Sequence, residues 1–216
     1  MTTQEFSNNW DVKIQSHTLK TTFGISNTIL QFDEYEKSVF LTESQDEIVT
    51  NFYNNTFEGK EEIREYLKEL LVTVELIPQD NIVTLPDKVM FIVNETVKLE
   101  GTDICNPDEW KDLEVIKYND LNRIKDNPFR GPTGNRALRL DTGKNTVKII
   151  NNNKVTSYKV TYLKEPTPIV LIDLSNDGLS IEGVNKISEC ELDSTLHDLI
   201  LDNAIKKALQ SRTTIK

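Results

Sequence analysis

The sequence contains little of several residue types on which common classes of enzyme and metalloprotein depend. Its 216 residues include two cysteines and two histidines, which are Cys105, Cys190, His17 and His197. So few allow one disulfide at most, and they lack the clustered Cys and His spacing of a metal site. We therefore expect free thiols in a reducing compartment, no bound metal and no cofactor.

Positive charge is also scarce. The chain has 25 Lys and Arg against 35 Asp and Glu, so its formal net charge is -10. This balance argues against affinity for nucleic acid or an anionic membrane, because counterion release from phosphates needs clustered Lys and Arg. The sequence also shows no signal-peptide pattern and no apolar run near the length of a membrane span. We expect a water-soluble protein with no membrane partner that stays in the cell where it is made.

Each motif that suggests catalysis lacks its required context. Asp141-Thr-Gly143 matches retroviral-type aspartic proteases, but a lysine and an asparagine follow it, which favours a hairpin turn. Gly131-Pro-Thr-Gly134 lacks the Gly-Lys-Ser/Thr ending of a phosphate loop. Neither histidine accompanies a nucleophile motif, and the two glutamates beside Cys190 raise the pKa of its thiol. The sequence predicts no catalytic residue and no enzyme.

The predicted elements are ordered as helices, then strands, then a helix. Residues 1–32 are polar with isolated apolar side chains, so we expect an extended N-terminal arm. Apolar spacing predicts two helices within residues 33–75, the first beginning after Asp33, which together form a helical hairpin. About six strands follow within residues 76–187, including a hairpin that turns at Pro86 and Asp87.

Residues 188–216 are expected to carry a C-terminal helix that starts near Leu196, packed on the domain or on a neighbouring subunit. The segregation of strands from helices predicts an α+β fold with an antiparallel sheet or a small β-sandwich, because no βαβ alternation is present.

The last third of the chain carries more apolar surface than a small domain obviously needs. Residues 166–172 form a strap in which two prolines interrupt strand pairing and an apolar run follows. The C-terminal helix has two apolar stripes, one of them at Leu201, Ile205 and Leu209. These surfaces are covered either by this domain or by another subunit.

Several arginines surround the loop at 130–136. This loop is either solvated or forms a salt-bridging contact with an acidic partner or a neighbouring copy, and the contact is slightly favoured. The candidate assembly residues are Pro166, Pro168, Ile169, Leu171, Leu201, Ile205, Leu209, Arg130 and Arg136.

Five short motifs occur in a fixed order over roughly residues 35–210. They are Phe40-Leu-Thr-Glu-Ser-Gln-Asp-Glu-Ile-Val49, Arg64-Glu-Tyr-Leu67, Asn127-Pro-Phe-Arg-Gly-Pro132, Tyr162-Leu-Lys-Glu-Pro-Thr-Pro-Ile169 and Cys190-Glu-Leu-Asp-Ser-Thr-Leu-His197. In this order they resemble structural proteins of crAss-like bacteriophages, namely the rings that stack beneath the portal in the short tail.

The resemblance implies a non-enzymatic virion protein, made in the cytoplasm of the host bacterium, that joins head to tail and lines the DNA channel. It implies a homo-oligomeric ring of twelve copies that contacts the portal and other ring or hub proteins, while genomic DNA passes without specific binding. Two alternatives are a head-completion or tail-adaptor protein elsewhere in the particle and a soluble cytoplasmic binding module.

Overall fold

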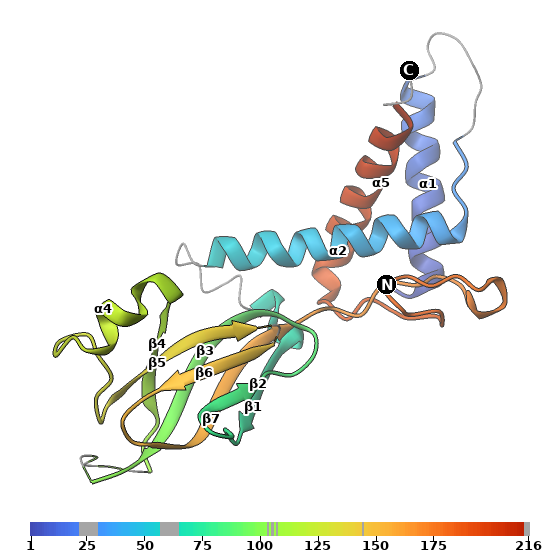
Figure 1. The fold of residues 1–216 in the computed structure, drawn as a ribbon. Helices are drawn as coiled ribbons and strands as arrows, with labels where there is room; N and C mark the ends of the chain where they lie inside the picture. Colours follow the sequence, from blue (N-terminus) through green and yellow to red (C-terminus); the bar gives the residue numbers. More distant parts are fainter. Residues whose placement is uncertain are drawn as a thin grey trace. The chain divides into compact units, whose positions relative to one another are not determined.

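The structure, a computed structural model, describes residues 1–21, 30–56, 65–102, 104, 106, 108–143 and 145–213. The chain divides into two units (Figure 1). Residues 1–70 and 165–216 form a helical unit, and residues 71–164 form a β unit inserted into it. The α+β class is confirmed. The strand region is shorter than expected, because the β unit ends at Lys164 and the strap belongs to the helical unit.

In the described part of the helical unit there are three long helices, α1 (Thr3–Thr21), α2 (Glu34–Thr56) and α5 (His197–Thr213). In Figure 1, α1 and α5 run side by side and α2 crosses them. The start of α2 is close to the prediction, since Asp33 accepts a hydrogen bond from the Glu36 backbone at 2.7 Å. Asp193 likewise caps the 3₁₀ turn Ser194–Leu196 that leads into α5, and its carboxylate accepts the backbone N–H of Thr195 at 2.9 Å.

The extended arm predicted for residues 1–32 is wrong over α1. This helix begins with a capping box, in which the Thr2 backbone donates to Glu5 at 2.8 Å and the Glu5 backbone donates to Thr2 at 3.2 Å. Phe6, Trp10 and Ile14 then recur every four residues and are all buried. Three large side chains on one narrow stripe are enough to dock an otherwise polar helix.

The second helix of the predicted hairpin is helical at Glu65 and Tyr66 but does not continue beyond them as predicted; residues 57–64 lie outside the described part. Lys68–Leu70 is a 3₁₀ turn, and Leu71–Leu76 is strand β1. Val72 and Val74 pack against the core of the β unit, which period-two alternation also allows. The apolar spacing at residues 71–76 fits both a helix and a strand, and pairing with β7 selects the strand.

Helix α5 packs against both other helices, which explains its two apolar stripes. Ile200 and Ala204 of one stripe and Leu201 and Ile205 of the other are at most 2% exposed. On one side Lys13 of α1 forms an ion pair with Asp202 at 2.6 Å. On the other, α2 and α5 are joined by ion pairs, which are Lys207–Glu47 at 2.9 Å and Arg212–Glu36 at 3.0 Å. The chain therefore covers both stripes itself.

The β unit is one seven-stranded sheet in the order β1-β7-β3-β4-β5-β6-β2. Its strands are β1, β2 (Ile82–Thr84), β3 (Val89–Glu100), β4 (Lys111–Ile116), β5 (Arg136–Gly143), β6 (Thr146–Ile150) and β7 (Lys154–Lys164). The pairing is antiparallel except between β4 and β5, which are parallel. The edge strands β1 and β2 are consecutive in the chain, so the sheet curls until it nearly closes into a barrel.

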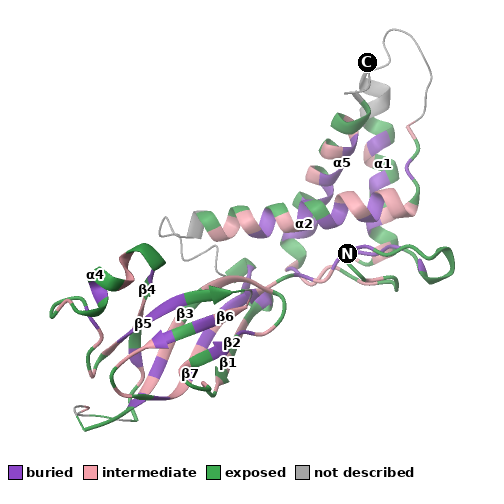
Figure 2. Ribbon diagram, viewed as in Figure 1, coloured by how far each residue is buried: buried purple, intermediate pink, exposed green. Residues whose placement is uncertain are grey.

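Apolar side chains from all seven strands fill the interior of this sheet, and buried and exposed positions alternate along several strands (Figure 2). The hairpin predicted around Pro86 is wrong, because β2 pairs with β6 while β3 pairs with β7 and β4. The hairpin at Asp141 is confirmed as β5 and β6. A second, smaller core lies outside the barrel, where Ile124 of helix α4 (Leu121–Lys125) packs with Ile116, Leu138 and Leu140.

Candidate interaction surface

The strap at 166–172 is held by side chains of α2. The backbone N–H groups of Ile169 and Leu171 donate to the hydroxyls of Thr42 at 3.1 Å and Ser38 at 3.0 Å. Two residues before Ile169 in the strap, the Thr167 carbonyl accepts a hydrogen bond of 2.9 Å from the Gln45 side chain. These three α2 residues are spaced i, i+4 and i+7, so they form one row on the helix. The row satisfies a backbone that has no neighbouring strand on that side.

The other side of the strap is satisfied by the segment that returns towards α5. Val170 and Ser188 exchange two backbone hydrogen bonds of 3.1 Å, and the Thr167 hydroxyl donates to Glu191 at 2.9 Å. Pro166, Pro168, Ile169 and Leu171 are buried in this arrangement.

The apolar candidates for assembly therefore lie inside the chain. Leu201 and Ile205 are buried between helices and Leu209 is half-buried, as the packing of α5 requires. The buried side chains among them belong to the core of the helical unit, whereas Leu209 keeps part of its surface exposed. The apolar run in the sequence showed that the strap must be covered, but not by which segment. In the structure α2 covers it, and the polar side chains of α2 that look solvent-facing in the sequence bond the backbone of the strap.

Replacing Thr42 by valine is expected to destabilise the protein by about 1–3 kcal/mol. The shape is kept, but the buried N–H of Ile169 loses its acceptor. Thr50, half-buried on the same helix, is the matched control, and its change to valine should alter stability by less than about 0.5 kcal/mol. Urea unfolding followed by circular dichroism measures both variants. Equal midpoints would show that the hydrogen bond contributes nothing.

The four arginines near the predicted loop have different roles. Arg139 is buried in the barrel beside Glu95, at 3.0 Å, and Arg136 donates to the carbonyls of Phe129 at 2.7 Å and Gly131 at 3.0 Å. Arg123 and Arg130 are exposed. Of the two arginines predicted to take part in assembly, Arg130 therefore lies on the surface, whereas Arg136 holds the loop in shape.

The Phe129 loop, residues 127–131, is built to present an exposed aromatic ring. The Asn127 side chain accepts the backbone N–H groups of Phe129 at 2.9 Å and Arg130 at 3.1 Å. A Cβ on Gly131 would lie 2.6 Å from the Asn127 carbonyl, so the turn requires glycine. With the Arg136 clamp, these bonds fix a loop in which the Phe129 side chain is 87% exposed.

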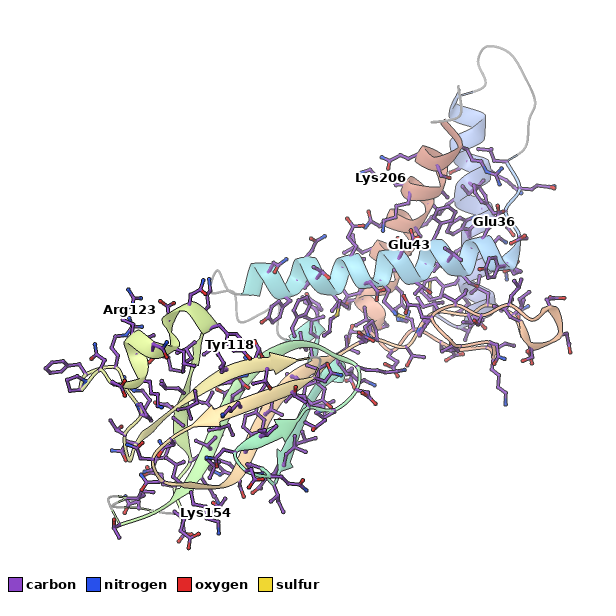
Figure 3. All side chains as sticks on the ribbon, viewed as in Figure 1. Glu36, Glu43, Tyr118, Arg123, Lys154 and Lys206 are labelled. Carbon is purple, nitrogen blue, oxygen red and sulfur yellow. The ribbon has the colours of Figure 1, made fainter. Side chains whose placement is uncertain are left out.

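The α4 segment, residues 117–131, extends this surface. Tyr118 is 60% exposed, and Figure 3 shows it with Arg123 on the same segment. The exposed cations are Lys117, Arg123, Lys125 and Arg130, against two aspartates. Large exposed aromatic side chains next to arginine are typical of interaction surfaces. Sequence reasoning identified Arg130 here but missed Phe129, although the Asn-Pro and Gly-Pro pairs around it indicated a fixed turn.

The net negative charge of the protein is concentrated in the helical unit. Residues 1–70 and 165–216 hold 22 Asp and Glu against 11 Lys and Arg, whereas residues 71–164 hold 13 against 14. The effect is strongest at Asp46 on α2, where burial, helped by Glu182 and Glu165, raises the pKa to about 6. Glu43 acts in the same direction and Lys207 opposes it. Between about pH 4 and pH 6 the folded protein therefore holds a proton on Asp46 that the unfolded chain has lost.

Replacing Asp46 by asparagine is expected to stabilise the protein at pH 7.5 by about 1–3 kcal/mol. Its pKa is raised on folding from 3.8 to about 6, so this carboxyl costs no stability below pH 4, and its cost builds up between pH 4 and 6 and is complete above. At pH 4 the variant should match the parent. Glu47→Gln on the same helix is the control and should gain nothing, since Glu47 forms an ion pair with Lys207. Thermal unfolding at both pH values tests this, and a gain at pH 4 alone would contradict it.

The described residues show no arrangement suited to catalysis. They contain no group of three His, Cys, Asp or Glu that could hold a metal ion, and no helix among them has the length and hydropathy of a membrane span. Burial raises the pKa of the Cys190 thiol to about 11, as expected for an unreactive cysteine. Burial lowers the pKa of His197, whose Nε2 lies 3.0 Å from the Leu192 carbonyl and whose Nδ1 contacts the Met1 amine.

An exposed aromatic ring held in place by hydrogen bonds, as in the Phe129 loop, is typical of a surface that contacts other proteins. All 216 residues match the family model for phage tail ring protein 3/4, and the chain belongs to this family. It is 37% identical to Ring protein 3 of Bacteroides phage crAss001 over 233 aligned positions, covering 100% of this chain and 98% of that protein. It is 30% identical to Ring protein 4/5 of the same phage, covering 96% and 92%.

Proposed function

We propose that this protein forms a closed homo-oligomeric ring below the portal, where it joins head to tail and lines part of the DNA path without catalysing a reaction. The similarity to proteins named as tail rings over the whole length of the chain carries this proposal. A ring of identical subunits needs two different surfaces on each copy that fit one another. Twelve copies would match a portal of twelvefold symmetry.

The charge distribution supports a place along the DNA. A conduit must let the genome slide, and an acidic wall repels phosphates, whereas clustered Lys and Arg would hold them. The helical unit has twice as many acidic as basic residues, so it is the part of the chain suited to face DNA. The β unit, which is nearly neutral, is suited to protein contacts.

Localisation in purified virions tests this proposal. Mass spectrometry should detect the protein in particles, and electron microscopy of virions with a gold label on the protein should place it between head and tail. Label elsewhere in the particle would favour a head-completion or adaptor protein. A stable monomer absent from virions would favour a cytoplasmic binding module and overturn the ring. Native mass spectrometry of the released complex gives the copy number.

Binding to DNA provides a separate check of the channel role. The purified protein should not retard double-stranded DNA in gels at 0.15 M salt, because its net charge is -10. Retardation that disappears as salt increases would show that the protein grips phosphates, and the proposed sliding surface would be wrong.

A further inference from the structure

The ring proposal leaves open which surfaces meet between neighbouring copies, and the structure carries two exposed surfaces of opposite charge. We propose that the α4 segment of one copy docks on the acidic loop, residues 172–189, of the next copy. This inference rests on the proposed ring, and it assigns the two sides of its head-to-tail contact.

The acidic loop is ordered by its own hydrogen bonds. The Leu174 backbone donates to Asn185 at 2.8 Å, and Ile181 and Val184 exchange two bonds of 2.9 Å. Val170, Leu174 and Ile181 anchor it in a small core with Tyr35 and Val39 of α2. In Figure 1 it is the orange loop that follows the strap within the helical unit. Both surfaces are therefore held in shape before any contact forms, which lowers the entropy lost on binding.

The acidic loop combines exposed apolar side chains with negative charge. Ile172, Leu179 and Ile187 are between 38% and 57% exposed. The exposed charges around them are Asp173, Asp177, Glu182 and Glu189, against Lys186 alone. No ion pair involves these four carboxylates among the described residues.

The α4 segment offers the opposite combination. Phe129 and Tyr118 supply apolar contact area, and within the described part of the chain Lys117 and Lys125 form no ion pair. An apolar centre with complementary charge around it is the usual anatomy of a specific protein interface. The two surfaces differ from one another, as a head-to-tail contact requires, and every copy carries both.

Charge reversal on either surface tests the contact. We would give phage either Lys117→Glu with Lys125→Glu, or Asp177→Lys with Glu189→Lys, and measure the protein in purified particles. Like charges would then face each other, so each pair should lower incorporation at least about tenfold. Combining all four changes in one chain restores opposite charges and should recover incorporation. Phe129→Ser should lower incorporation without any charge change.

The controls separate loss of docking from loss of folding. Lys88→Glu with Lys148→Glu makes the same charge change at exposed positions of the β unit outside both surfaces, and incorporation should stay at the wild-type level. Every purified variant should unfold at the wild-type temperature, because all the altered residues are exposed at the surface.

Each result bears on one proposal or the other. If the Lys117→Glu, Lys125→Glu variant is incorporated normally, the proposed docking contact is wrong, but the proposal that the protein forms a ring is unaffected. If it blocks assembly and the fourfold variant does not recover, the α4 segment contacts a different protein, which also overturns the inference. If the wild-type protein is missing from particles, the ring proposal itself fails.

Discussion

Replacing Arg139 by methionine is expected to destabilise the β unit by about 3–5 kcal/mol, because it leaves a buried carboxylate without its partner. The side chains of Arg139 and Glu95 are 8% and 6% exposed, and they form an ion pair at 3.0 Å. The Tyr158 hydroxyl donates to the same Glu95 carboxylate, and Arg139 also pairs with Asp141 at 2.7 Å. Burial already raises the pKa of Glu95, which these contacts oppose.

The loss should depend on pH. Without Arg139 the pKa of Glu95 rises further, and a carboxyl whose folded pKa is raised loses stability as the pH increases. Arg139→Met should therefore be less harmful at pH 5 than at pH 7.5. The added change Glu95→Gln should recover part of the loss at pH 7.5, because it removes the unpaired charge.

Urea unfolding should be followed by fluorescence in a Trp10→Phe background, in which Trp110 of the β unit is the only tryptophan. Arg123→Met, at an exposed position, is the control and should change stability by less than about 0.5 kcal/mol. An Arg139→Met midpoint equal to that of the parent would show that the buried pair does not stabilise the barrel.

Replacing Trp10 by alanine should destabilise the helical unit by about 3–5 kcal/mol. Its ring is fully buried and packs edge-on to Phe32 at 5.7 Å and nearly parallel to Phe40 at 6.3 Å between centroids. Residues 71–164 form a separate unit, so the fluorescence of Trp110 should still report a folded β unit. The helical circular dichroism signal should be lost at a lower temperature than in the parent protein.

Val12→Ala is the matched control for this change, because Val12 lies on the same helix and is 66% exposed. It should alter the midpoint little, since an exposed side chain loses little packing on truncation. If Trp10→Ala also unfolds at the parent's temperature, α1 is not part of the stable core, and the polar N-terminal region behaves as the arm that its composition suggests.

The sequence predicted the elements whose apolar spacing is broad and whose ends are capped. Helix α2 follows Asp33, and α5 follows Asp193, as expected. For α1 the signal was present in Thr2, Glu5 and the Phe6 stripe, but three apolar residues among many polar ones resemble isolated docking points.

The parts that could not be predicted depend on partners distant in the chain. Val74 fits a helix and a strand equally well, and its pairing with Val160 of β7 decides for the strand. Ser38 and Thr42 look solvent-facing in the sequence, but their hydroxyls accept hydrogen bonds from backbone N–H groups of the strap, more than 120 residues later. The exposed ring of Phe129 likewise follows from hydrogen bonds within a loop, which composition does not reveal.

The insertion of the β unit into the helical unit has a consequence for synthesis on the ribosome. The first strand pairs with the last, Leu71 opposite Leu163, so the barrel is complete once Lys164 has emerged. Helices α1 and α2 emerge earlier, yet α5 and the strap, which cover their apolar faces, are made last. We therefore expect the β unit to fold first and the helical unit to fold only after α5 has been made. Until then the nascent chain should expose the apolar faces of α1 and α2.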